Sequence, residues 1–264
     1  MDLRGRVAVV TGAGSGIGRA IATGLGHQGS RLALVDIDEA ALSETQARIG
    51  RGGDVSAHVA DVSSRADMAA LPRAVLERHS QVDVLVSNAG LWVAGPLLAV
   101  PLEDFELAMN VNFWGAVYAA RFFLPHLQAR DQAHIVNVSS AIGLLALPEQ
   151  TAYSASKFAI RGFTDALRAE LAGTRVGVTA VYPSAVDTHF ITAVRAAGVP
   201  REEAVRRARV RARTSVDRVA ARVIRAIRRN KSRARVGSDA HALDWLTRIS
   251  PSAAYSLAAR LRLS

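Results

Sequence analysis

The chain has 264 residues, half of them apolar, and a formal net charge of +10. This length and composition can bury one large core, so we expect a single domain. The absence of cysteine excludes disulfides, thiolate metal sites and cysteine nucleophiles, and we expect no metal. Residues 1–189 carry fifteen Lys or Arg against eighteen Asp or Glu, whereas residues 190–264 carry eighteen against five, so the positive charge belongs to the last quarter.

The first residues of the chain indicate where in the cell the protein is located. Arg4 and Arg6 lead directly into an apolar run at 7–10, without the apolar stretch of a signal peptide. No later segment reaches the length of a membrane span. We therefore expect a cytoplasmic protein.

Strand-like and helical segments alternate along the chain. Buried strands that alternate with helices are typical of an α/β fold with a doubly wound parallel sheet and helices on both faces. We expect a core at about 5–190 plus 214–240, an Arg-rich segment at 190–213 and a tail at 241–264. The predicted strands are 7–11, 31–36, 55–59, 82–87, 133–139, 177–182 and 234–236, and the predicted helices lie near 17–25, 64–79, 103–130, 153–171 and 215–229.

A glycine-rich turn follows the first predicted strand, with the spacing Gly12-x3-Gly16-x-Gly18. Glycines permit a tight turn and bring backbone N–H groups and a helix N-terminus against a pyrophosphate. A glycine run by itself can also be an ordinary loop. Here it follows a strand and opens a helix, which is the context that dinucleotide binding requires.

Asp36 ends the second predicted strand, eighteen residues beyond Gly18. A carboxylate there can accept hydrogen bonds from the adenosine ribose and would repel a 2′-phosphate. Ser15, and not a basic residue, precedes Gly16, so the sequence favours NAD over NADP. The alternative is that Asp36 only caps a loop.

Lysine occurs twice against thirty-one arginines, and Lys157 follows Tyr153 by four residues. Positions four apart share one helix face, and a cation near a phenol favours its ionised form. The pair therefore suits acid/base chemistry, although a surface ion-pair position on an ordinary helix is the alternative.

Polar residues at the ends of further strands complete a recognisable set. With the glycine turn, Asp36, Asn88-Ala89-Gly90, a serine thirteen residues before Tyr153, and Lys157 in this order, residues 5–190 resemble the short-chain dehydrogenase/reductase family. The resemblance implies a Rossmann-type fold and hydride transfer between nicotinamide and a carbinol or carbonyl carbon.

The resemblance also implies roles for single residues. Tyr153 would be the general acid/base, and Lys157 would bind the nicotinamide ribose and lower the tyrosine pKa. Ser140 would hydrogen-bond the reacting oxygen, and the backbone carbonyl of Asn112 would hold a water that links Lys157 to solvent. The cofactor-contacting set would be Gly12, Ser15, Gly16, Ile17, Gly18, Asp36, Asp61, Val62, Asn88, Ala89, Gly90, Tyr153, Lys157, Pro183, Val186 and Thr188.

The chain departs from the family pattern in two places. Ser87 stands where a second Asn is usual, and Ser184 follows Pro183 where Gly is usual. Neither change removes a reacting group, but Ser184 alters the backbone expected near the nicotinamide amide.

The segments expected around the substrate are apolar or basic. The loops at 141–148 and 91–93 are apolar, which favours an apolar alcohol or ketone, unless these residues only pack beneath the sheet edge. The segment at 190–213 corresponds to the family's substrate lid. Its arginines at 206–213 form either a solvated helix or a site for an anionic handle such as phosphate or CoA.

The sequence also bears on the partners of the protein and on an alternative function. The tail through Leu261 and Arg262 is apolar and basic, and we expect it to contribute to peripheral membrane attachment or to cover the substrate pocket. No nucleic-acid motif is evident. The resemblance implies a homodimer or homotetramer through the helices near 103–130 and 153–171. The alternative function is a non-catalytic dinucleotide-binding regulatory protein on the same fold.

Overall fold

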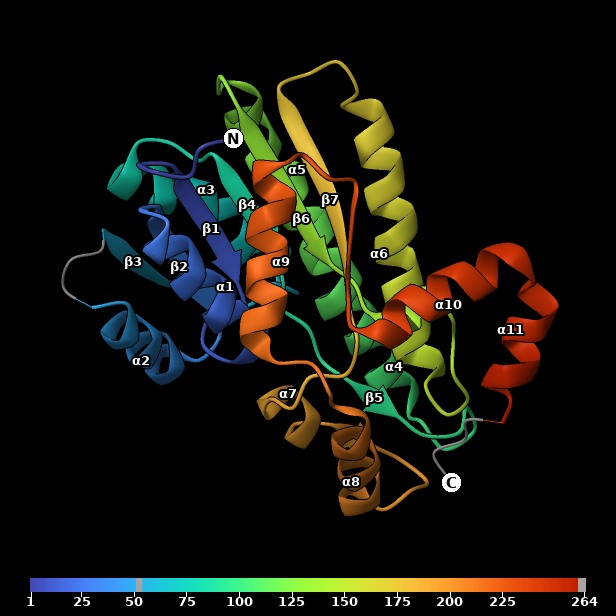
Figure 1. Ribbon diagram of the computed structural model, residues 1–264. Helices are drawn as coiled ribbons and strands as arrows, with labels where there is room; N and C mark the ends of the chain where they lie inside the picture. The colour runs from blue at the N-terminus through green and yellow to red at the C-terminus, as the bar shows by residue number, and fades with distance from the viewer. Residues whose placement is uncertain (51–53, 261–264) are drawn as a thin grey trace.

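A seven-stranded parallel sheet forms the centre of the protein, shown in Figure 1. The computed structural model describes residues 1–50 and 54–260. The strand order is β3-β2-β1-β4-β6-β7-β9. The chain adds β2 and β3 on one side of β1 and the later strands on the other, which confirms the predicted doubly wound class. The strands are β1 (Val7–Thr11), β2 (Arg31–Asp36), β3 (Val55–Val59), β4 (Val84–Ser87), β6 (Ala133–Val138), β7 (Val176–Pro183) and β9 (Arg233–Val236).

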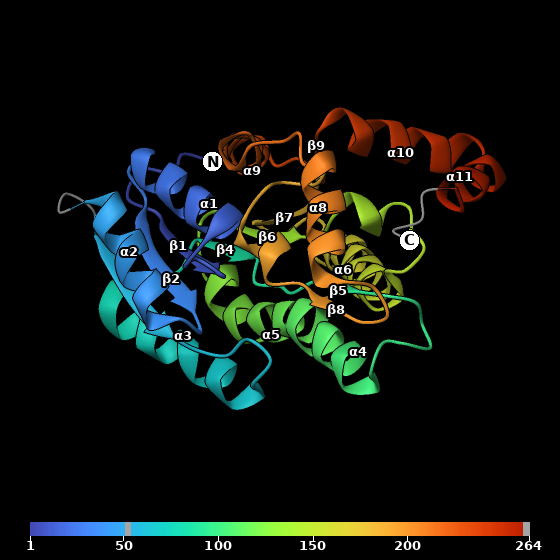
Figure 2. The same cartoon turned by 90° about the horizontal axis from the view of Figure 1, so that it is seen from below.

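Helices cover both faces of the sheet, as Figure 2 shows from below. Successive strand residues point to opposite faces, so Val9 joins one core and Val10 the other. Helices α1 (Gly16–His27) and α9 (Val216–Arg228) cover the first face, and α3 (Arg65–His79), α5 (Gly115–Gln128) and α6 (Thr151–Glu170) cover the second.

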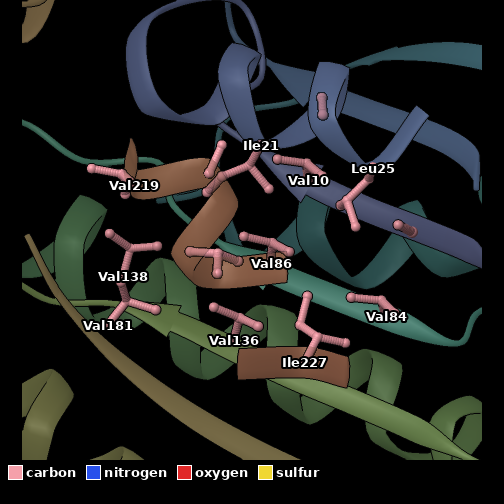
Figure 3. Close-up of a cluster of buried hydrophobic side chains, with 14 of the residues drawn as sticks. Val10, Ile21, Leu25, Val84, Val86, Val136, Val138, Val181, Val219 and Ile227 are labelled. Carbon is pink, nitrogen blue, oxygen red and sulfur yellow. The ribbon is translucent and has the colours of Figure 1, made fainter. Parts of the chain in front are cut away.

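The core beneath α1 and α9 explains the helical pattern at 215–229. Val219 and Ile227 of α9 are buried with Ile21 and Leu25 of α1 (Figure 3). The arginines of α9 occupy its other side, as the period of the sequence predicts. The valines that these helices cover come from four strands and are Val10, Val84, Val86, Val136, Val138 and Val181.

The predicted helix near 103–130 consists of three consecutive segments. Helix α4 (Leu102–Met109) passes through a π-helical turn, η1 (Asn110–Trp114), into α5. Helix α2 (Glu39–Ile49), capped by Asp38, was not predicted. Only Leu42 and Thr45 of α2 are buried, so its sequence carries little apolar periodicity.

The last quarter is more structured than the sequence predicts. Helices α7 (His189–Thr192) and α8 (Arg201–Arg211) flank β8 (Arg195–Ala196), which pairs in parallel with β5 (Val93–Ala94). The tail forms α10 (Ser238–Ile249) and α11 (Pro251–Ala258). Pro251 opens α11, where its missing N–H is not needed.

Two expectations from the sequence concern the end of the tail and the absence of a membrane span. Residues 261–264 of the predicted tail, including Leu261 and Arg262, lie outside the described residues. Across residues 1–50 and 54–260, no helix combines the length and the apolar character that crossing a membrane requires.

Candidate active site

The C-terminal ends of β1, β4, β6 and β7 open onto one cavity of about 580 Å³. The structure brings together all the predicted site residues except Gly18 and Asn112, which do not line this cavity. The residues that do are Gly12, Ser15, Gly16, Ile17, Asp36, Asp61, Val62, Asn88, Ala89, Gly90, Ser140, Tyr153, Lys157, Pro183, Val186 and Thr188.

The glycines of the first turn are required by its geometry. Gly12 and Gly16 have φ values of 64° and 51°, in the left-handed region that favours glycine. A Cβ on Gly12 would lie 2.8 Å from the Ala89 Cα, and a Cβ on Gly18 would lie 1.9 Å from the Gly12 carbonyl oxygen. Gly18 therefore lets α1 pack directly on the turn, and the exposed N-terminus of α1 fits a pyrophosphate.

Asp36 and Asn88 hold this turn from both sides. The Asp36 Oδ2 accepts a hydrogen bond from the Gly14 N–H at 2.8 Å, and its Oδ1 accepts one from the Asp38 N–H at 3.2 Å. The Asn88 Nδ2 donates to the Thr11 carbonyl at 3.0 Å. The carboxylate thus lies beside the glycine turn and borders the cavity, where it fits an adenosine ribose.

Tyr153 and Lys157 project from adjacent turns of α6 into the cavity. Both are buried, with 7% and 3% of their surfaces exposed. The Lys157 Nζ lies 5.7 Å from the centroid of the Tyr153 ring and donates to the Val138 carbonyl at 3.1 Å. The four-residue spacing therefore places ammonium and phenol at one site, as predicted.

Burial changes the proton affinity of both groups. Desolvation raises the pKa of Tyr153 to about 12, against an opposing hydrogen bond with Ser140. Desolvation also lowers the pKa of Lys157 to about 8. Burial therefore opposes ionisation of the phenol in the chain alone, and the lowering of the tyrosine pKa that the resemblance implies for Lys157 stays a prediction.

Asn112 acts through its side chain on the loop after β4. Its Oδ1 accepts from the Leu91 N–H at 2.8 Å, and its Nδ2 donates to the Leu91 carbonyl at 3.0 Å and to the Ser156 Oγ at 2.9 Å. It lies in η1 and is 2% exposed. Asn112 therefore fastens this loop to α6, and the predicted role of its carbonyl stays a prediction.

The sequence missed several cavity residues that come from the lid and tail. The Phe190 ring lies 5.9 Å from the Tyr153 ring, and Leu243 of α10 also lines the cavity. The position of α10 at the cavity agrees with the expectation that the tail covers the substrate pocket. The other expected role of the tail, membrane attachment, stays a prediction. No signal in the sequence shows that α7 and α10 fold back onto this cavity.

Ser184, the departure from the family pattern, has a partner in the tail. Its hydroxyl donates to the Asp239 carboxylate, and its N–H donates to the Val236 carbonyl at 2.9 Å. Asp239 lies in the first turn of α10 and also lines the cavity. The serine therefore connects the end of β7 to the tail.

Apolar side chains form part of the cavity wall. Trp92, Ile142 and Leu147, from the two loops predicted to flank the substrate, line the cavity together with Phe190 and Ile191. The Trp92 Nε1 donates to the Gln150 Oε1 at 3.1 Å, so the indole N–H of this wall already has a hydrogen-bond partner.

Among the arginines of α8, three pair with carboxylates, whereas Arg201 donates to the Thr192 carbonyl. Arg206 and Arg207 bond to Glu203, and Arg209 pairs with Asp187 at 3.3 Å. Arg211 lines the cavity, and its side chain has no carboxylate partner in the described part of the chain. The predicted solvated helix therefore accounts for the first set and not for Arg211.

Together, the sheet, the glycine turn and the paired Tyr153 and Lys157 define a dinucleotide-binding oxidoreductase. Residues 6–198 match the family described as short chain dehydrogenase. The chain belongs to the short-chain dehydrogenase/reductase family, which confirms the resemblance stated from the sequence.

Relatives and solved structures agree with this assignment. SadH of Mycobacterium tuberculosis, named as an oxidoreductase, is 38% identical over 254 residues, which cover 94% of this chain and 92% of SadH. A short-chain dehydrogenase/reductase from Burkholderia phymatum in complex with NAD has a TM-score of 0.88 and 32% identity, with 94% of each chain covered. A 3-ketoacyl-(acyl-carrier-protein) reductase from Brucella melitensis with NADH has a TM-score of 0.81 and 27% identity, with 90% of this chain and 99% of that chain covered.

Proposed function

We propose that this oxidoreductase transfers a hydride between NAD(H) and the carbinol or carbonyl carbon of an apolar alcohol or ketone. The observation that carries the proposal is the buried pair of Tyr153 and Lys157 at the junction of the glycine-turn end and the apolar end of one cavity. An acid/base pair at such a junction is what alcohol oxidation needs and what a purely regulatory binding protein does not need.

The residues of the chain would handle the proton while the nicotinamide, when bound, exchanges the hydride. During oxidation, the Tyr153 phenolate oxygen takes the proton of the substrate hydroxyl. Ser140 donates a hydrogen bond to the same oxygen, on which charge develops. The Lys157 ammonium stabilises the phenolate across the short distance that separates it from the ring. In the reductive direction, Tyr153 donates the proton.

Asp36 supports NAD over NADP. Its carboxylate borders the cavity beside the glycine turn, where a 2′-phosphate would meet a negative charge. Arg19 is the nearby cation that could offset this repulsion. Its guanidinium is engaged by Glu44 at 3.0 Å and by the Thr45 Oγ1 at 2.9 Å, so its charge is already paired.

The test is NADH formation from NAD with a panel of apolar secondary alcohols and, in parallel, polyols and hydroxy acids. We expect turnover with the apolar set, and turnover confined to the polyols would contradict the substrate class. Tyr153→Phe should lower kcat by about 10²-fold or more and leave NADH binding, measured by fluorescence titration, nearly unchanged. Substantial residual turnover in this variant would contradict the role of Tyr153.

A second substrate class is favoured by Arg211. Arg211 lines the active-site cavity together with apolar residues such as Phe190 and Ile191, and it has no carboxylate partner among the described residues. This arrangement suits a 3-oxoacyl chain joined to an anionic carrier. The Brucella melitensis relative is named for such a substrate. Arg211→Gln should raise KM for an acetoacetyl-CoA probe and not for an apolar ketone, whereas Arg206→Gln should change neither. Equal KM values in wild type and Arg211→Gln would exclude this class.

We also propose self-association through α4, α5 and α6. Trp114 is 42% exposed, and its ring stacks on Tyr118 at 5.6 Å, which in turn stacks on Phe122 at 6.4 Å. Tyr118 and Phe122 are half-buried, and a partly exposed aromatic row on a helix is typical of an interface. Light scattering should give a dimer or tetramer, and Trp114→Glu should shift it toward the monomer. A wild-type monomer would contradict the proposal.

A further inference from the structure

A second cavity, of about 420 Å³, lies outside the active site. It is bounded by α9, the end of β9 and the first turn of α10, which lie along one side of the molecule in Figure 2. Four arginines and a histidine line it, namely Arg218, Arg222, Arg225, Arg235 and His241. We propose that this cavity binds a compact anion that carries several phosphate charges.

The arginines of α9 are not explained by the packing of that helix. Its buried side consists of apolar residues such as Val219 and Val223, which fully account for its attachment to the sheet. Arg218, Arg222 and Arg225 recur every three or four positions on the opposite side, so they share one face. That face, and not the core, forms a wall of the cavity.

The positive charge in this cavity is largely uncompensated. Among the described residues, no carboxylate forms an ion pair with Arg218, Arg222 or Arg225. Arg235 is partly compensated, because Asp244 accepts from it at 2.5 Å. Like charges that converge in a concavity repel one another, and a bound anion relieves that repulsion.

The nearest acidic side chain of α10 faces the other cavity. Asp239 accepts a hydrogen bond from Ser184 and lines the active-site cavity, whereas Ser238 lines the basic one. The first turn of α10 therefore separates the two sites, and no carboxylate lines the basic one.

Guanidinium groups select the chemistry of the ligand. Their planar donors match phosphate oxygens in pairs, and several of them together favour an anion with more than one negative charge. A single carboxylate could not satisfy three unpaired arginines in a cavity of this size. The phosphates could come from a soluble metabolite or from a phospholipid headgroup, which share this chemistry.

The experiment titrates the full-length protein with tripolyphosphate by calorimetry, with and without NADH so that binding in the active-site cavity is recognised by competition. We expect saturable binding that NADH does not displace. The variant with Arg222→Gln and Arg225→Gln should raise Kd by about tenfold or more. The matched control, with Arg228→Gln and Arg229→Gln, removes the same charge at the C-terminal end of α9, outside the cavity, and should keep the wild-type Kd.

The outcomes are distinct. Equal losses in the two double variants would show general charge attraction and overturn the proposal, as would displacement by NADH. Co-sedimentation with phosphatidylcholine vesicles that contain phosphatidic acid separates the sources. If only these vesicles bind, and only the cavity variant loses binding, the phosphate belongs to a lipid. Binding of neither probe to wild type overturns the proposal, and thermal melts of each variant show whether it has kept its fold.

Discussion

Lys157 should make the unfolding free energy depend on pH in an unusual direction. Burial lowers its pKa from the ordinary 10.5 to about 8 in the folded protein, and unfolding returns it to water. Between these values the unfolded chain binds more protons than the folded one. Stability therefore rises with pH across this window, because the stability slope follows the excess of protons on the unfolded chain.

The magnitude follows from the shift. At about 1.36 kcal/mol per pKa unit, the charged lysine costs the folded state about 3 kcal/mol near neutral pH. Most of that cost disappears once the folded lysine is neutral. Between about pH 7 and pH 10 wild type should gain about 2.5 kcal/mol relative to Lys157→Met, which has no group to titrate there.

The assay is urea unfolding of wild type and Lys157→Met at both pH values, because their difference removes all other titrating groups. Lys231 supplies the matched control, since it is the only other lysine and is exposed in the turn between α9 and β9. Lys231→Met should show no such pH-dependent difference. A constant difference between wild type and Lys157→Met would refute the argument that Lys157 is held in a desolvated site.

Three further predictions follow from single contacts. Asp36→Ala should lower the ratio of NAD to NADP catalytic efficiency about tenfold or more, measured by steady-state kinetics, and an unchanged ratio would count against its proposed role. Gly18→Ala should lower the free energy of unfolding, measured with urea, by at least about 2 kcal/mol, because its Cβ would overlap the Gly12 carbonyl. The control is Gly162→Ala, which has open space around it and should raise the free energy of unfolding by about 0.5–1 kcal/mol. Asp83→Ala should lower the free energy of unfolding by about 3–5 kcal/mol, since this fully buried carboxylate pairs with Arg6 and Arg130. A loss below about 1 kcal/mol in the same urea experiment would show that the two arginines find other partners.

Much of the sheet was predictable because its signals are local. The strands Val7–Thr11 and Arg31–Asp36 are short apolar runs that end in a glycine cluster and an acid, and the structure begins and ends them at the predicted residues. The glycine turn and the pair of Tyr153 and Lys157 were likewise visible as spacing. In a parallel sheet, residues that follow successive strands meet at one edge, so their convergence could be inferred from their order alone.

The parts that were missed depend on contacts between distant segments. Helix α2 has few buried residues, and α11 begins at Pro251, a residue type that also commonly ends helices. The proximity of Phe190 to Tyr153, and of Asp239 to Ser184, depends on how the lid and tail return to the sheet. No periodicity encodes that return.

The sequence alone determined the fold class, the dinucleotide turn and the acid/base pair, because each is a short pattern with its own geometry. Only the tertiary structure showed the burial of that pair and the surroundings of the arginines in the last quarter. Desolvation depends on the surroundings of a group, so the spacing of Tyr153 and Lys157 could not show that burial raises the pKa of the first and lowers the pKa of the second. In the same way, folding pairs some of these arginines with acids, as it pairs Arg206 with Glu203. It places Arg211 at the active-site cavity, and Arg218, Arg222 and Arg225 at the second cavity.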